Sequence, residues 1–200
     1  AGTEGPTSDS NIWNLEGYAI SSYYGYVADG LFRSEEELKK GPLRTGIEEV
    51  GDIRYKDLDD DGKITAAGDR QIIGNQMPKW TGGFNFSVSY KNFELSGLLQ
   101  GAFDAKRYYN GEASYAFFNS ASCLNKHWDR WSEENPNGNF PRLSLRSQTN
   151  NQMSTFWLQD ASYLRMKNLT LAYTLPSDLI SRIGLSFAQV YLAGENLFTI

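Results

Sequence analysis

The segment WTGGFNFSVSYKNFELSGLLQGAF, residues 80–103, decides the fold class because apolar and polar residues alternate along it. The apolar positions are even before Lys91 and Asn92 and odd after them. A two-residue turn at these positions explains the change of phase, since Asn tolerates positive φ. The predicted hairpin pairs are Tyr90 with Phe93, Val88 with Leu95, Phe84 with Leu99, and Trp80 with Phe103. Directly paired residues share a face, so both strands should present one apolar face.

The length of this hairpin fits a membrane. Ten residue steps separate Trp80 from Tyr90, and at about 3.3 Å per residue they span roughly 33 Å. Tilted by about 40°, such a strand covers about 25 Å, the height of the apolar band of an outer-membrane barrel. Aromatic residues stand at both ends of the apolar face, where interface girdles belong. The alternative is a soluble β-sandwich that buries this face.

Five strands and two long connections follow from the same reasoning. Strands are expected at about 16–28, 80–90, 93–104, 158–175 and 185–198, and outer loops at about 29–79 and 105–157. Short turns on one side and long loops on the other are typical of outer-membrane barrels. The predicted fold class is all-β, an antiparallel transmembrane β-barrel fragment with long extracellular loops. In the strand 158–175, Arg165 and Lys167 share a parity with Leu169 and Leu171, so both basic residues should lie beyond the membrane.

Composition excludes several classes of protein. The chain has 5 Trp, 12 Tyr, 11 Phe and 19 Gly, a mixture that suits β-structure, and lacks an apolar run of the roughly 18 residues that a membrane helix needs. Its net charge is −5 and the basic residues do not cluster, so nucleic acid is not an expected partner. The single cysteine, Cys123, excludes an internal disulfide.

An acidic motif at residues 57–69 resembles the first half of an EF-hand Ca²⁺ loop. The candidate ligands are Asp57, Asp59, Asp61, Lys63 through its carbonyl, and Asp69. Gly62 would supply the sharp turn, and Ile64 would anchor the loop to the core. Position 12 of the motif is Gly68 in place of the usual bidentate Glu, which is a departure from the pattern. A solvated acidic turn held by Asx hydrogen bonds is the alternative to a structural Ca²⁺ site.

Catalytic chemistry has little support. The only histidine, His127, lies among aromatic residues, and no Ser/His/Asp or Cys/His arrangement emerges. Neighbouring acids such as Glu133 and Glu134 do not show two carboxylates set across a sugar. The sequence therefore predicts a protein that is not an enzyme.

The second long loop is rich in aromatic residues. The candidate substrate-binding residues are Tyr108, Tyr109, Trp128 and Trp131. Flat aromatic faces suit sugar rings. The alternative is that these side chains pack the loop against itself.

Several stretches, taken in order, resemble the SusC/RagA family of TonB-linked outer-membrane proteins. They are ISSYYGYVADGLF (20–32), GDIRYKDLDDDGKIT (51–65), DRQIIGNQMPKWTGGF (69–84), YKNFELS (90–96), WDRWSEENPNGNFPRL (128–143), YLRMKNLTLAYTLP (163–176) and VYLAGENLFTI (190–200). The resemblance implies a 22-strand barrel of which this chain is a C-terminal portion, with the plug domain and the last strands absent.

The same resemblance implies the location and the partners. The family imports oligosaccharides, and sometimes peptides, across the outer membrane of Gram-negative cells, with energy from TonB and a SusD-like surface lipoprotein as a lid. TonB would act through the N-terminal region that this chain lacks, and outer-membrane lipid would surround the barrel. The acidic loop could brace the surface that meets the lid. The alternative function is a secreted, Ca²⁺-stabilised β-sandwich, as a carbohydrate-binding or glycosidase accessory module.

Overall fold

The computed structural model describes residues 12–13, 17–145 and 149–200, so the beginning of the predicted strand 16–28 lies outside the described residues. The chain forms two compact units. Unit 1 comprises Ala1–Met77 and Lys106–Asp160, and unit 2 comprises Pro78–Ala105 and Ala161–Ile200.

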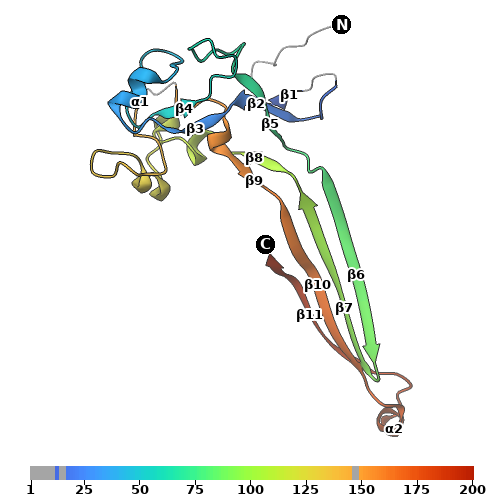
Figure 1. The fold of residues 1–200 in the computed structure, drawn as a ribbon. Helices are drawn as coiled ribbons and strands as arrows, with labels where there is room; N and C mark the ends of the chain where they lie inside the picture. The colour runs from blue at the N-terminus through green and yellow to red at the C-terminus, as the bar shows by residue number, and fades with distance from the viewer. Residues whose placement is uncertain (1–11, 14–16, 146–148) are drawn as a thin grey trace. The chain divides into compact units, whose positions relative to one another are not determined.

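Unit 2 is built on one antiparallel sheet of four strands, in the order β11-β10-β7-β6 (Figure 1). The strands are β6 (Trp80–Tyr90), β7 (Phe93–Phe103), β10 (Tyr163–Thr174) and β11 (Gln189–Thr199). All four predicted hairpin pairs are present in the register of β6 with β7, from Trp80 with Phe103 to Tyr90 with Phe93. The predicted hairpin is confirmed.

The turn of this hairpin differs in one detail from the prediction. The residue with left-handed backbone is Lys91, at φ 55°, and not Asn92. Asn92 instead links the turn to the neighbouring strand, because its Nδ2 donates to the carbonyl of Thr174 at 2.9 Å. The backbone N–H of Thr174 donates in return to the carbonyl of Asn92 at 2.8 Å.

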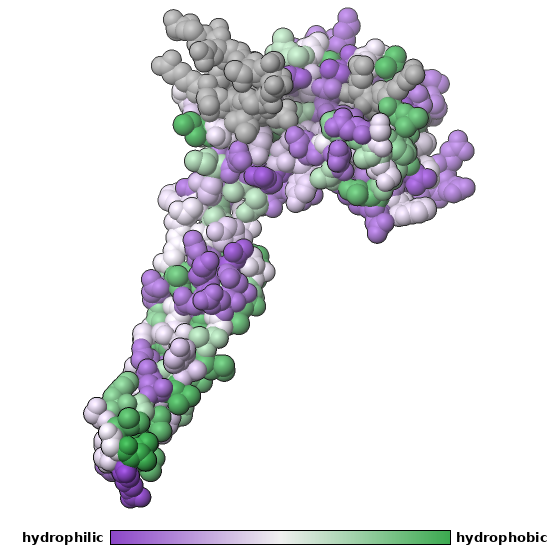
Figure 2. All heavy atoms as spheres, turned by 180° about the vertical axis from the view of Figure 1, so that it is seen from behind, coloured by the Kyte–Doolittle hydropathy of each residue, from purple (hydrophilic) through white to green (hydrophobic). Residues whose placement is uncertain are grey.

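The sheet has one apolar and one largely polar face, since paired residues share a side. The apolar face carries Trp80, Phe84, Phe86, Val88 and Tyr90 of β6, Phe93, Leu95, Leu99 and Phe103 of β7, Leu164, Met166, Leu169, Leu171 and Tyr173 of β10, and Val190, Leu192 and Phe198 of β11. Several of these side chains are strongly exposed, with Phe84 at 63% and Val88 at 62%. Hydrophobic residues run along the sheet beside hydrophilic ones in Figure 2.

The predicted position of Arg165 is wrong because a β-bulge interrupts β10. Its register with β7 shifts between Met166 and Asn168, so Lys167 is the extra residue. On the N-terminal side of the bulge, Met166 pairs with Leu99 on the apolar face, and Arg165 pairs with Gln100 on the opposite face. The guanidinium of Arg165 donates from Nε to the hydroxyl of Thr199 at 3.0 Å. Because Arg165 lies on the polar face of the sheet, its charge does not have to lie beyond the apolar band.

The remaining connection of unit 2 is short and partly helical. It contains α2 (Ser177–Ile180) and the 3₁₀ turn η5 (Ser181–Ile183), and α2 lies at the same end of the sheet as the turn between β6 and β7 (Figure 1). Ile180 is buried, and its carbonyl accepts the N–H of Leu185 at 3.1 Å. The predicted strand 185–198 corresponds to β11, which begins later, at Gln189, and ends at Thr199. The predicted strand 158–175 is divided into β9 (Leu158–Asp160) and β10.

Unit 1 contains shorter elements. They are β1 (Ile12–Trp13), β2 (Ser22–Tyr26), β3 (Ala28–Leu31), α1 (Glu35–Lys40), β4 (Ile53–Tyr55), β5 (Arg70–Asn75), β8 (Lys106–Tyr108), β9, and the 3₁₀ turns η1 (Gly111–Ala113), η2 (Phe118–Ser120), η3 (Asn125–Asp129) and η4 (Thr155–Trp157). Strands β1, β2 and β5 form one sheet, β3 pairs with β4, and β8 pairs with β9. The ranges 29–79 and 105–157, predicted as loops, therefore contain paired strands that are too short to show periodicity.

The core of unit 1 is aromatic. Its buried members are Tyr26, Leu31, Ile53, Tyr55, Ile64, Tyr115 and Trp157. Trp157 packs edge-on against Tyr115, with ring centroids 5.2 Å apart. Among the described residues, no helix is long and apolar enough to cross a membrane.

Candidate metal site and aromatic residues

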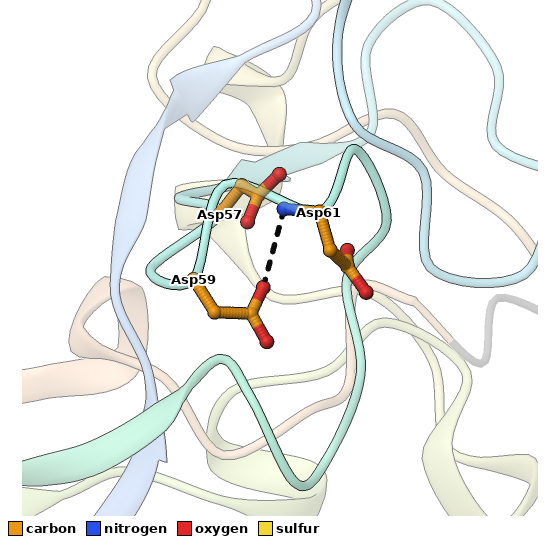
Figure 3. A group of neighbouring side chains, drawn as sticks. All are labelled: Asp57, Asp59 and Asp61. Carbon is orange, nitrogen blue, oxygen red and sulfur yellow. Dashed lines mark hydrogen bonds between the residues drawn. The ribbon is translucent and has the colours of Figure 1, made fainter.

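The acidic loop that follows β4 brings three carboxylates together. Oxygen atoms of Asp57, Asp59 and Asp61 all lie within 4.8 Å of one another, and Figure 3 shows the three side chains gathered in one turn of the chain. Carboxylate oxygens are the ligands that Ca²⁺ prefers. The predicted convergence of these three residues is therefore present.

Backbone hydrogen bonds fold the loop around these carboxylates. The N–H of Gly62 donates to Asp57 Oδ2 at 2.7 Å, and that of Lys63 donates to Asp61 Oδ1 at 2.8 Å. A longer bond of 3.4 Å joins the N–H of Asp61 to Asp59 Oδ1 (Figure 3). Gly62 has φ 84°, the left-handed conformation that the predicted sharp turn requires. These bonds hold the three acids in one turn of the chain.

The electrostatics of the loop differ between two of its acids. At Asp57, partial burial raises the pKa of the carboxyl group. Hydrogen bonds, first among them the one from the Gly62 N–H, have a larger opposite effect, so the net pKa lies below the usual value. At the exposed Asp59, desolvation by the neighbouring loop atoms and then repulsion from the Asp61 carboxylate hold the pKa above the usual value. Mutual repulsion of this kind is what a bound cation would relieve.

Asp69 has a different role from these three acids. It is fully buried, and its carboxylate accepts N–H bonds from Leu58 at 2.7 Å and from Thr65 at 2.6 Å. Asp69 thus closes the base of the loop with both oxygens. Ile64 is buried in the core of unit 1, which confirms the predicted anchor.

The Asp59 carboxylate lies close to Gly68, at position 12 of the motif. A Cβ added at Gly68 would overlap with Asp59 Oδ2. No side chain fits there while the Asp59 carboxylate keeps its position. Gly68 thus leaves room for the Asp59 carboxylate at the position where an EF-hand loop carries Glu.

The four predicted substrate-binding aromatics divide into two pairs. Tyr108 and Trp131 pack against the core, and the hydroxyl of Tyr108 lies 2.6 Å from that of Tyr115. Tyr109 and Trp128 are exposed, Trp128 at 79%. Within the described part of the chain, no ring contact joins two of the four.

His127 is a buried structural residue. Its Nδ1 accepts the N–H of Leu124 at 3.0 Å, so Nε2 carries the proton and donates to the carbonyl of Ser114 at 2.9 Å. These bonds fix the turn η3, from which the side chain of Trp128 projects.

Sequence reasoning missed a cavity beside this turn. It has a volume of about 270 Å³, and its lining includes Leu124, Trp128, Arg130 and Leu143. In the sequence, only the aromatic side chain of Trp128 indicated a binding site here. The contribution of Leu143 could not be foreseen, because Leu143 comes from a separate stretch of the loop.

Comparison with known proteins places the chain in a class. No family model matches it. TonB-dependent receptor P3 of Formosa agariphila is 32% identical over 186 residues, which are 92% of this chain and 18% of the relative. TonB-dependent receptor P26 of the same organism is 32% identical over 185 residues, with the same shares. The chain therefore spans about a fifth of the length of the curated relatives it matches.

Solved structures share the fold. A structure of the RagAB peptide transporter matches over 96% of this chain and over 21% of the matched RagAB chain, at a TM-score of 0.66 and 22% identity. A structure of the RagAB peptide importer in the closed-closed state covers the same shares, at a TM-score of 0.62 and 23% identity. The chain belongs to the TonB-dependent receptors. Its resemblance to the SusC/RagA members of this class is confirmed.

Proposed function

We propose that this chain is a barrel segment of an outer-membrane, TonB-dependent importer and has no catalytic role. The relatives are named TonB-dependent receptors, and the structures that share the fold are those of a peptide importer. The barrel of the whole protein, with the 22 strands that the family resemblance implies, belongs to this proposal.

The exposed apolar face of the four-stranded sheet carries the proposal. Its residues include Trp80 at 73% exposure together with Phe84 and Val88, on strands of 11 residues. A β-sandwich would bury this face against a second sheet. In an outer-membrane barrel the same face contacts lipid, and the polar face points inward. The exposure therefore supports the barrel over the secreted module.

Membrane fractionation tests the location. The full-length gene product should sediment with the outer membrane of its Gram-negative host and require detergent for extraction. A freely soluble product would contradict the importer function and favour the secreted β-sandwich.

Substrate and partners follow from the same proposal. We infer import of oligosaccharides or peptides, energy from TonB, and a SusD-like surface lipoprotein as the lid; the name of RagAB as a peptide importer supports the peptide class. Exchanging Asp57, Asp59 and Asp61 for Asn in the full-length protein should weaken co-purification of the lipoprotein if the acidic loop braces the lid. Unaltered complex formation would contradict that role of the loop.

We also propose a structural Ca²⁺ at Asp57, Asp59 and Asp61. Besides the convergence of the three carboxylates, Asp57 Oδ1 is buried and has no hydrogen-bond partner in the described part of the chain. A cation would satisfy that oxygen and neutralise the repulsion at Asp59.

Calorimetric titration of the full-length protein with Ca²⁺ tests this site. We expect heat of binding that disappears in Asp59→Asn combined with Asp61→Asn and persists in Asp178→Asn, a control outside the loop. Absence of heat, together with a thermal stability that a chelator leaves unchanged, would exclude the site.

A further inference from the structure

The cavity beside η3 is small and mainly apolar. Its volume of about 270 Å³ lies just below the range of about 300–1,000 Å³ that is typical of pockets for whole small molecules. Its lining includes the apolar side chains of Leu124, Trp128 and Leu143, together with the sole cysteine, Cys123. A space of this size and character suits a single apolar side chain.

The indole of Trp128, which lines this cavity, is exposed and is carried on a turn held by hydrogen bonds. Trp128 is 79% exposed and Leu124 is 43% exposed, yet the turn that carries the indole is fixed by the two hydrogen bonds of the buried His127. An exposed Trp on a fixed backbone binds with little loss of conformational entropy. This indole is therefore well placed to receive a ligand.

One cation lines the cavity, and its charge is not compensated. The guanidinium of Arg130 has no ion pair among the described residues. The adjacent Asp129 is held elsewhere, by Asn139 Nδ2 at 2.6 Å. Lys126 is not among the lining residues, and its ammonium donates to the carbonyl of Ala113 and lies over the rings of Phe140 and Trp157. Arg130 thus offers a fork of donors to a carboxylate.

The lining favours a peptide over a sugar. Recognition of a sugar requires several polar groups that can bind its hydroxyls. The polar side chains of this cavity are mainly Asn125 and Arg130, because both ring nitrogens of His127 are already used in hydrogen bonds within the loop. An aromatic or aliphatic side chain next to a carboxylate matches both the apolar wall and the cation.

We propose that this cavity is a subsite for an imported peptide: it takes an apolar side chain against Trp128, and Arg130 pairs with a neighbouring carboxylate. The subsite rests on the proposed importer function for the source of the peptide, and it names the substrate class.

Equilibrium binding to the full-length protein in detergent tests the subsite without transport. The probe is a hexapeptide, blocked at both ends, in which Asp precedes Phe between Ala residues; matched peptides carry Asn in place of Asp or Ala in place of Phe. We expect the Asp–Phe peptide to bind about tenfold more tightly than either, since a charged hydrogen bond or a buried aromatic ring is worth at least about 1.4 kcal/mol. Binding should quench tryptophan fluorescence, and Trp128→Phe should remove that signal while the peptide still binds by calorimetry.

Two variants assign the affinity to the cavity. Trp128→Ala should weaken binding of the Asp–Phe peptide about tenfold or more, and Arg130→Gln should abolish its advantage over the Asn peptide. Arg107→Gln and Tyr18→Ala, exposed residues outside the cavity, serve as matched controls and should leave the affinity unchanged. Equal affinity for the Asp and Asn peptides, or no effect of Trp128→Ala, would overturn the proposal.

Two further outcomes separate the possible failures. If Cys123 resists thiol labelling and Trp128 resists quenching by acrylamide in the full-length protein, other parts of the protein cover the cavity and the subsite is refuted.

A neutral oligosaccharide that binds through Trp128, where the peptides do not, would replace the peptide class with sugars. Failure of peptide binding in a protein that still fractionates with the outer membrane overturns the subsite alone, whereas a soluble product that retains peptide binding overturns the importer alone.

Discussion

The sheet of unit 2 and the loops of unit 1 are stabilised in different ways. Strands of 11 or 12 residues pair along their length in the sheet, and their apolar side chains remain exposed. In unit 1 the strands are 2 to 6 residues long, and buried polar groups join segments far apart in sequence. The sheet therefore depends on its surroundings for burial of apolar area, whereas unit 1 carries its own core.

The largest effect is expected from breaking the buried polar network of unit 1. Asp52 accepts from Arg142 Nε at 2.7 Å and from Asn150 Nδ2 at 2.9 Å, and its side chain is almost fully buried. Asp52→Ala removes the buried acceptor of Arg142 Nε and Asn150 Nδ2 and leaves Arg142 only its exposed partner Glu49, at 3.0 Å. We therefore expect the free energy of opening unit 1 to fall by about 3–5 kcal/mol. Hydrogen exchange at residues 149–157 of the full-length protein measures the change.

The matched control for Asp52 is an exposed ion pair. Lys106 and Asp160 lie 2.8 Å apart in the same unit, with the Asp160 side chain largely exposed. Asp160→Ala should cost no more than about 1 kcal/mol. Equal losses in the two variants would show that burial does not determine the strength of the network.

A smaller effect should separate the two faces of the sheet. Phe86 lies on the apolar face of β6, and the adjacent Ser87 lies on the polar face, where its hydroxyl donates to Glu94 at 3.0 Å. Phe86→Arg should destabilise the protein in a bilayer by about 2–4 kcal/mol. Ser87→Arg should cost clearly less, as measured by denaturant unfolding of full-length protein in lipid vesicles. Equal costs would contradict contact of the Phe86 face with lipid.

The smallest predicted effect depends on pH and concerns unit 1 alone. Burial raises the pKa of Glu48, but N–H bonds from Thr45 and Gly46 lower it more, and the net pKa lies below 4.5. A carboxyl with a depressed pKa stabilises the folded state fully above its unfolded pKa and loses that contribution as the pH falls through the folded value. The cost of Glu48→Gln should therefore be larger at neutral pH than well below pH 4.5, by denaturant unfolding. A cost that does not change with pH would contradict this role.

The sheet could be predicted because its information is local. Alternation within residues 80–103 determined the faces, and the two-residue turn determined the register of Trp80 with Phe103. The phase of Arg165 could not be predicted, since a bulge is a single extra residue with no fixed sequence signal. In unit 1, Asp52 and Arg142 meet across 90 residues, and no periodicity records that pairing.

The candidate metal site was predictable to the same limited extent. The spacing of Asp57, Asp59 and Asp61 encodes their convergence in one turn. The burial of Asp69 and the contact between Asp59 and Gly68 depend on how the loop closes, and spacing alone does not reveal either.

The bulge at Lys167 also changes how related sequences should be compared. Removing this one residue would restore strict alternation and exchange the faces of Tyr163–Met166. A single-residue gap at this position in an alignment is therefore a statement about orientation: it tells whether the basic residue aligned with Arg165 lies on the same side of the sheet as Gln100 or on the side of Leu99.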